Sequence, residues 1–312
     1  MNSKPTFSFD YLTRPNKNIE RKLLFDLVSR LVNREALRKC QYIGLGSIWF
    51  VDFCLAHKLL GISDMVSIEN KPEKFMRAVF NQPFSCIRVV MGDTTNVLPS
   101  LFADSKRKQR IVWLDHEGFP DADILEDIRT VCSSAAEQSV LLLTVNAHRG
   151  NLSRSRVQEQ RENELRLRFG NVVPSDLPPD WDNDLGFPKL LGQMLIDYAK
   201  HATIKAGRKE RFHPVVNMRY RDGAPMVTVG GVIQESPPFP ADVLGTREEQ
   251  YNIEVPILTV REKLALDKVL PCSKVLSEND MKKTIGFPLR REEFEAYRKH
   301  YHLYPVFHEL AL

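Results

Sequence analysis

The sequence predicts an α/β protein in which helices flank a sheet of five parallel strands and an antiparallel hairpin. Two observations predict this class. Over the first half of the chain, short apolar runs alternate with segments of helical periodicity, a pattern typical of parallel sheets. Further along, the runs His213–Tyr220 and Met226–Val232 flank an Asp-Gly turn, which is typical of a hairpin.

The composition is that of an ordinary globular protein. The 312 residues are 43% hydrophobic and 27% charged, enough for one large domain with additions or for two domains. A formal net charge of +4 argues against a molecule built as a whole to bind polyanions. No signal peptide or membrane-spanning run is evident, so we expect a cytoplasmic protein that does not enter membranes. The five scattered cysteines form no metal-binding motif, and we expect reduced thiols and no metal site.

The elements of the predicted sheet follow one another in regular order. Residues 1–16 are expected to form an extended arm, and a helix with one apolar stripe continues to residue 32. Apolar runs typical of strands lie at Tyr42–Leu45, Met65–Ile68, Cys86–Met91, Ile111–Leu114 and Ser139–Val145. Helical patterns lie between them at Ile48–Leu60, at residues 72–80, after Thr94 and at Ile124–Ser133, where Asp121 is the expected N-cap.

The composition changes after the fifth strand. Residues 149–210 are polar and charged, with expected helices at Arg154–Arg168 and Phe187–Ala206, and we interpret this insertion as a lid or a partner surface. Residues 233–255 are rich in proline and are expected to be loop. The tail helices are predicted at Thr259–Leu270, Ser277–Ile285 and Arg290–His302. The predicted domains are a core of residues 1–232 and, in residues 233–312, a linker with a helical C-terminal module.

Residues with ligand-binding chemistry gather around the first strand–helix–strand unit. Gly44, Gly46 and Ser47 follow the first strand, where glycines let a backbone approach a ligand beside the free N–H groups of a helix. Glu69 ends the second strand, 25 residues after Gly44 (69 − 44), where a carboxylate can accept from two ribose hydroxyls. The unit therefore predicts a nucleoside site. The alternative is an ordinary βαβ unit with a turn glycine and a solvated glutamate.

Polar residues also follow the next three strands. After the third strand, Asp93 can accept from the exocyclic amine of an adenine ring, cap a short helix, or do both. The fourth strand is followed by three residues that handle protons: Asp115, His116 and Glu117. The fifth is followed by Asn146 and His148. Because the carboxyl ends of parallel strands share one edge of a sheet, we expect these residues to face one crevice.

The order of these elements, over about residues 20–232, resembles the class I S-adenosylmethionine-dependent methyltransferase fold. The resemblance matches Gly44 and Gly46 to the family's glycine turn, Glu69 to its ribose-binding acid, Asp93 to its adenine-side acid and Asp115 to its strand-four motif. It implies a Rossmann-like methyltransferase sheet and S-adenosylmethionine as the cofactor. The implied cofactor-binding residues are Tyr42, Gly44, Gly46, Ser47, Glu69, Asp93 and Asp115.

Two departures from the family pattern bear on activity. Tyr42 stands where the family usually carries an acid, and Ile48 stands in place of a third glycine. The alternative hypothesis is therefore a catalytically silent nucleotide-binding or scaffold protein on the same fold. A nicotinamide dehydrogenase is disfavoured, because the third glycine is missing and the terminal hairpin fits methyltransferases better.

Methyl transfer to a hydroxyl requires in-line geometry and a base. The resemblance therefore implies methyl transfer to an oxygen or nitrogen acceptor, with four catalytic candidates: Asp115, His116, Glu117 and His148. The alternative for both histidines is a solvated loop position. The sequence does not identify the acceptor. Basic faces at Arg154–Arg168 and Arg290–His302 suit a nucleic acid or protein partner, against the alternative of solvated helix faces.

Overall fold

The computed structural model describes residues 14–103, 108–153, 155, 157–238, 243–272 and 285–305. The chain forms two compact units. The larger comprises residues 24–219 and 224–251, and the smaller comprises residues 1–23, 220–223 and 252–312. Most of the predicted N-terminal arm and of the predicted helix Ser277–Ile285 lies outside the described residues.

Five parallel strands form the larger unit's sheet. They are β1 (Gln41–Leu45), β2 (Met65–Glu69), β3 (Ile87–Met91), β4 (Arg110–Asp115) and β5 (Ser139–Asn146). β1 pairs in parallel with β2 and with β4, while β2 pairs with β3 and β4 with β5. The boundaries of these five strands lie within one residue of their predictions, because an apolar run between polar ends marks a buried strand.

An antiparallel hairpin continues the sheet, as predicted. β7 (Pro225–Gln234) pairs antiparallel with β5, from Ser139 opposite Ile233 to Asn146 opposite Met226. β6 (Arg211–Arg221) precedes it. The strand order is β3-β2-β1-β4-β5-β7-β6-β8, which confirms the predicted sheet. β8 (Tyr251–Ile253) lies in a stretch predicted as loop, and that prediction was wrong there, since three residues are too few to show a period.

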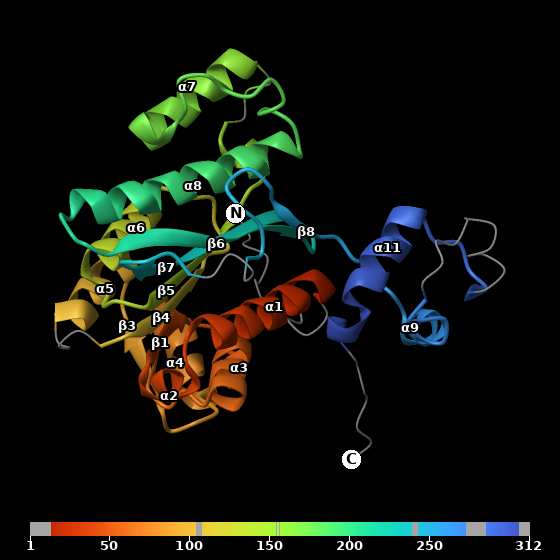
Figure 1. The fold of residues 1–312 in the computed structure, drawn as a ribbon, viewed down its shortest axis with the longest axis horizontal. Helices are drawn as coiled ribbons and strands as arrows, with labels where there is room; N and C mark the ends of the chain where they lie inside the picture. Colours follow the sequence, from red (N-terminus) through yellow and green to blue (C-terminus); the bar gives the residue numbers. More distant parts are fainter. Residues whose placement is uncertain are drawn as a thin grey trace. The chain divides into compact units, whose positions relative to one another are not determined.

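Helices cover both faces of the sheet, because side chains alternate along each strand. Ile43, Val112 and Leu141 belong to a core that also includes residues of α5 (Thr94–Ala103), α6 (Ala122–Ser134) and α8 (Gly186–Lys205), drawn in Figure 1. Tyr42 and Trp113 point to the other face. There both rings contact Phe25 of α1 (Pro15–Leu31), with centroids 6.2 and 5.8 Å apart. α4 (Pro72–Asn81) packs beside β2 and β3.

The helix after the glycine turn, α3 (Val51–Leu60), begins three residues later than the predicted start at Ile48. Phe50 is fully buried and adopts the left-handed conformation at φ 48°, so helical geometry starts only at Val51. The sequence pattern does not predict the short helix α2 (Arg34–Lys39), because Leu37 is its one buried residue.

The predicted insertion of residues 149–210 divides into a surface part and a core part. α8 buries an apolar face against α6 and β7, so it belongs to the fold itself. α7 (Gln158–Phe169) begins later than the predicted Arg154 and lies nearer the surface. Its arginines form ion pairs with acids: Arg161 with Asp182, Arg166 with Glu162 and Arg168 with Glu164. These pairs reduce the net positive charge that α7 presents to a partner. The lid or partner role of the insertion stays a prediction, and it now concerns only residues 149–185.

The smaller unit contains the predicted tail helices α9 (Val260–Asp267) and α11 (Arg291–His300). Phe294 and Tyr297 belong to an apolar stripe on α11 and have no exposed surface. The Tyr297 hydroxyl donates to Asp267 at 2.7 Å, and Lys22 donates to the Leu303 carbonyl at 2.7 Å. The stripe therefore packs within the chain, and a partner role for the basic face stays a prediction.

Candidate cofactor and acceptor site

The glycine turn after β1 has no room for side chains. A Cβ on Gly46 would lie 2.8 Å from the Glu69 Cβ and 2.9 Å from the Ile68 carbonyl oxygen. A Cβ on Gly44 would lie 3.1 Å from the ring of Tyr42. The Gly46 N–H also donates to the Ile68 carbonyl at 2.5 Å. The two glycines therefore hold the end of β1 tightly against the end of β2, and no side chain of their own covers the backbone there.

Ser47 shapes the loop between β1 and α3. Its hydroxyl oxygen accepts a hydrogen bond from the Trp49 backbone N–H at 3.2 Å, a local turn that sets the direction of the chain. Trp49 is 48% exposed, next to the glycine turn in the sequence. Its indole is therefore a natural fluorescent reporter for any ligand that binds over this turn.

Glu69 and Asp93 lie at the ends of the neighbouring strands β2 and β3. Glu69 is 7% exposed, and its Oε1 accepts from the Lys71 N–H at 3.0 Å. Asp93 is exposed, and its Oδ1 accepts from the Asn70 side-chain amide at 2.9 Å. The Gly92 N–H donates to the Glu69 carbonyl at 3.0 Å and holds the two ends together. Each carboxylate keeps one oxygen that accepts no hydrogen bond from the described part of the chain.

His116 follows the last residue of β4, the half-buried Asp115, and precedes the exposed Glu117. Its backbone N–H donates to the Thr144 carbonyl at 2.9 Å, which fixes the end of β4 against β5. The His116 side chain is 18% exposed, with its Nε2 buried and 3.8 Å from Oδ2 of Asp127. Burial lowers the pKa of His116 more than the nearby carboxylates raise it, so the ring is neutral at neutral pH.

Asp127, on α6, is a fully buried acid close to this strand end. The Thr94 hydroxyl donates to its Oδ2 at 2.5 Å, while its Oδ1 has no hydrogen-bond partner among the described residues. Burial raises the pKa of Asp127 to about 7, although the hydrogen bond from Thr94 opposes the shift. A buried acid and a partly buried histidine, with pKa values displaced in opposite directions, therefore lie close together at the end of β4. Such an arrangement is often found where protons are transferred.

A polar hollow of about 620 Å³ follows the end of β5. Its lining includes His148, Arg149, Ser153, Ser155, Arg161 and Asp184. The Gly150 N–H donates to Nδ1 of His148 at 3.2 Å, so the neutral ring carries its proton on Nε2. Arg149 pairs with Asp184 at 3.1 Å, and Arg161 pairs with Asp182. The hollow is therefore polar without a large net charge.

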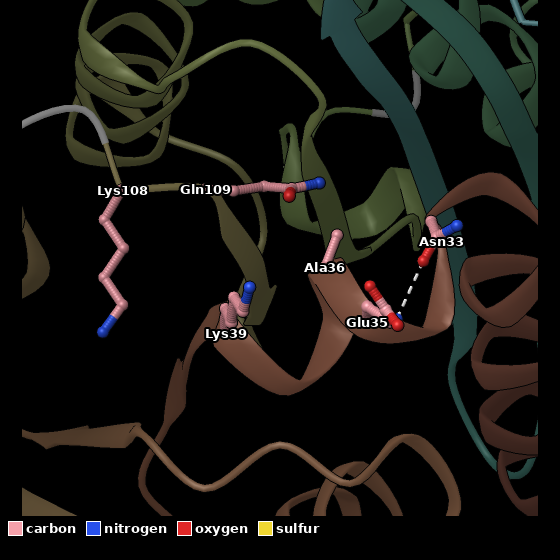
Figure 2. Close-up of a pocket in the computed structure, with 6 residues that line it drawn as sticks. All are labelled: Asn33, Glu35, Ala36, Lys39, Lys108 and Gln109. Carbon is pink, nitrogen blue, oxygen red and sulfur yellow. Dashed lines mark hydrogen bonds between the residues drawn. The ribbon is translucent and has the colours of Figure 1, made fainter.

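A second hollow, of about 520 Å³, lies at the opposite edge of the sheet and is drawn in Figure 2. It is lined by α2 and the residue before it, and by Lys108 and Gln109, which directly precede β4. Lys108 forms an ion pair with Asp64. Since the predicted site residues follow the carboxyl ends of the strands, this hollow at the amino ends of β1 and β4 is not part of the candidate site.

Tyr42, which replaces the acid usual in the resembled family, is fully buried in β1. Its ring meets Phe53 edge-on at 5.0 Å, and its hydroxyl donates to Oδ2 of Asp52 at 2.7 Å. A carboxylate thus reaches this strand from the first turn of α3.

Sequence reasoning missed Asp52 and Asp127. Asp127 carries a signal in the sequence, because it lies three residues after Ile124 and four before Val131, on the apolar face of its helix. No comparable pattern marks Asp52, whose contact with Tyr42 depends on the path of the chain.

No group of histidine, cysteine, aspartate and glutamate side chains in the described ranges is arranged to hold a metal ion. All five cysteines are free thiols. None of the helices that the structure describes is both long and apolar enough to cross a bilayer.

A sheet with this strand order, a glycine turn at the end of β1, an acid as the last residue of β2 and another acid after β3 has the architecture of a class I methyltransferase. The model of the family described as "Putative O-methyltransferase" matches residues 9–312, and the chain belongs to this family. The predicted methyltransferase class is thereby confirmed.

The chain is also similar to solved structures. Trm1 from Pyrococcus horikoshii, in complex with S-adenosyl-L-methionine, is 12% identical over 76% of this chain and 59% of that chain, with a TM-score of 0.49. A predicted O-methyltransferase from Agrobacterium tumefaciens is 13% identical over 75% and 85%, with a TM-score of 0.36. TYW2 from P. horikoshii, in complex with MeSAdo, is 12% identical over 65% and 61%, with a TM-score of 0.35. The chain thus spans about three fifths of the length of Trm1. No curated protein matches the chain significantly in sequence.

Proposed function

We propose that the chain is an S-adenosylmethionine-dependent methyltransferase that methylates a hydroxyl oxygen. The observation that carries the proposal is the row of polar groups along neighbouring strand ends: Asp93 after β3, Glu69 on β2, the glycine turn after β1 and His116 after β4. The family description supports oxygen as the acceptor atom.

The strand order gives the cofactor its direction. Asp93 would hold the adenine, because its carboxylate can accept from the exocyclic amine. Glu69 would hold the ribose through Oε2, the oxygen that accepts no hydrogen bond from the described residues. The glycine turn of β1 would then receive the methionine end. S-adenosylmethionine supplies an electrophilic methyl carbon on a positively charged sulfur.

His116 is the base in this proposal. Its Nε2 is buried and faces Asp127, so Nδ1 is the nitrogen that takes the acceptor's proton. The lowered pKa keeps the ring unprotonated and ready before reaction. Asp115 and Asp121 favour the positive ring that forms when the proton arrives. Glu117 is exposed and has no assigned step.

His148 is a donor here and not a base. The Gly150 N–H occupies Nδ1, and the proton on Nε2 suits a hydrogen bond to an oxygen of the acceptor. The hollow beside it is wide enough for a small polar acceptor, and its paired arginines leave no large charge to select an anion.

The proposal is tested first by titration calorimetry with S-adenosylmethionine, S-adenosylhomocysteine and NAD⁺. The first two ligands are expected to bind and NAD⁺ is not. Binding of NAD⁺ alone, or of none of the three, would refute the proposal. Release of S-adenosylhomocysteine is then measured over a panel of phenols, catechols and alcohols.

With an acceptor in hand, replacement of His116 by Gln is expected to lower kcat by roughly 10²–10⁴-fold while cofactor affinity stays. A matched His148→Gln variant should mainly raise the acceptor's KM. A fully active His116→Gln enzyme would exclude His116 as the base. Tight cofactor binding without turnover on any acceptor would favour the alternative, a catalytically silent nucleotide-binding or scaffold protein.

A further inference from the structure

A carboxylate from α3 lies against the glycine turn. Oδ2 of Asp52 accepts a hydrogen bond from the Tyr42 hydroxyl at 2.7 Å. A Cβ built on Gly44 would lie 3.3 Å from this same oxygen and 3.2 Å from the Phe53 ring. A side chain at position 44 would therefore crowd this oxygen, whereas glycine leaves the carboxylate beside bare backbone.

This oxygen lies where the methionine end of the cofactor is expected. With adenine at β3 and ribose at β2, the next strand in the sheet is β1, and the glycine turn ends it. The methionine end carries an ammonium group, which needs hydrogen-bond acceptors and is bound most strongly by a carboxylate. Asp52 is half-buried, in surroundings that strengthen such a contact relative to water.

We propose that Asp52 binds the ammonium group of the cofactor's methionine end and that Tyr42 holds the Asp52 carboxylate in place. The proposal rests on the proposed function. It gives Tyr42 a positioning role. The resembled family carries an acid at this position of the strand, whereas here Tyr42 donates a hydrogen bond to an acid on α3. Asp52 makes the contact with the ligand.

A simpler account is that Asp52 only satisfies the buried Tyr42 hydroxyl. A buried hydroxyl needs an acceptor, but any neutral oxygen serves, including the amide oxygen of asparagine. The two accounts differ in what they expect of Asp52→Asn. If the carboxylate only satisfies Tyr42, the variant binds every ligand as the parent does. If it binds the ammonium group, the variant loses affinity only for ligands that carry an ammonium group.

Titration calorimetry on the full-length chain with three thioether ligands separates these accounts. S-adenosylhomocysteine has the ammonium and the carboxylate. Its deaminated analogue keeps only the carboxylate, and 5′-methylthioadenosine has neither. All three lack the sulfonium charge, so that charge does not confuse the comparison. For Asp52→Asn we expect a loss of roughly tenfold to a hundredfold in affinity for S-adenosylhomocysteine and none for 5′-methylthioadenosine. The deaminated analogue should bind the variant at least as well as the parent.

Two further variants complete the test. Tyr42→Phe keeps the buried ring and removes the hydroxyl, so we expect a smaller loss with the same dependence on the ligand. Glu73→Gln removes an exposed acid in the first turn of the neighbouring helix α4, and it should change no affinity. Thermal melting of each variant confirms that it is folded.

An unchanged affinity of Asp52→Asn for S-adenosylhomocysteine overturns the inference, as does an equal loss for all three ligands. In both cases the parent still binds, so the proposed function stands. A parent that binds none of the three ligands overturns the proposed function and this inference together.

Discussion

Replacing Glu69 with Gln isolates the carboxylate that is proposed to bind the ribose. The amide has almost the same shape, so the packing beside the glycine turn is kept, and its oxygen can still accept from the Lys71 N–H. At the position of Oε2 an NH2 group, which can only donate, then replaces a negatively charged acceptor. Hydrogen bonds to a charged group contribute about 1.5–3 kcal/mol, and about 1.4 kcal/mol corresponds to a factor of ten in Kd. We therefore expect a roughly tenfold to hundredfold loss of affinity for S-adenosylhomocysteine.

Calorimetry and quenching of Trp49 fluorescence both measure this loss. 5′-Methylthioadenosine should lose as much affinity as S-adenosylhomocysteine, since both have the ribose. That equality sets Glu69→Gln apart from Asp52→Asn. The exposed Glu73 again provides the matched control, as Glu73→Gln. A folded Glu69→Gln variant with the parent's affinity would remove Glu69 from the site and refute the proposed orientation of the cofactor.

Two further predictions concern stability and partners. The folded chain keeps the Asp127 proton up to a pKa of about 7, whereas an unfolded chain loses it near 3.8, so the parent should lose stability as the pH rises between these values. Asp127→Asn should remove this decline, of which about 3 kcal/mol lies between pH 5 and the pKa of about 7. The difference in melting temperature between parent and variant at pH 5 and pH 8 measures this part; a constant difference would contradict the shift. In the tail, changing the exposed Arg291 and Lys299 to Glu should abolish retention on immobilised nucleic acid at low salt without affecting cofactor affinity. Retention that survives the charge reversal would assign these residues no partner role.

The strands and the acids that follow them could be predicted because their signals are local. A buried strand is an apolar run, and Glu69 and Asp93 come directly after such runs. The start of α3 could not be predicted, because it depends on Phe50 adopting a left-handed conformation that bulky residues rarely adopt. β8 could not be predicted either, because whether three residues form a strand depends on their neighbours in the sheet.

The contacts that tune the site are non-local, and the sequence does not reveal them. Asp127 is buried because α5 packs on α6 and brings the Thr94 hydroxyl to its carboxylate, 33 residues away in the chain. The same packing leaves the acid close to His116. Helical periodicity places Asp127 on the apolar face of α6. It does not predict which group donates a hydrogen bond to the carboxylate, or that a histidine lies near it.

Tyr42 is the main sequence argument for a silent protein, and the structure weakens that argument. Residues 42 and 44 lie on the same face of β1, so an acid at position 42 would point towards α3, as the tyrosine does. The tyrosine reaches further, and its buried hydroxyl needs an acceptor. That acceptor is a carboxylate in the first turn of α3, where the helix dipole favours negative charge. The turn therefore keeps a negative charge on the side where the family carries one, supplied by the helix instead of the strand. The affinity of Asp52→Asn for an ammonium-bearing ligand tests whether this charge serves the cofactor, whereas turnover on an acceptor separates an enzyme from a silent nucleotide-binding protein.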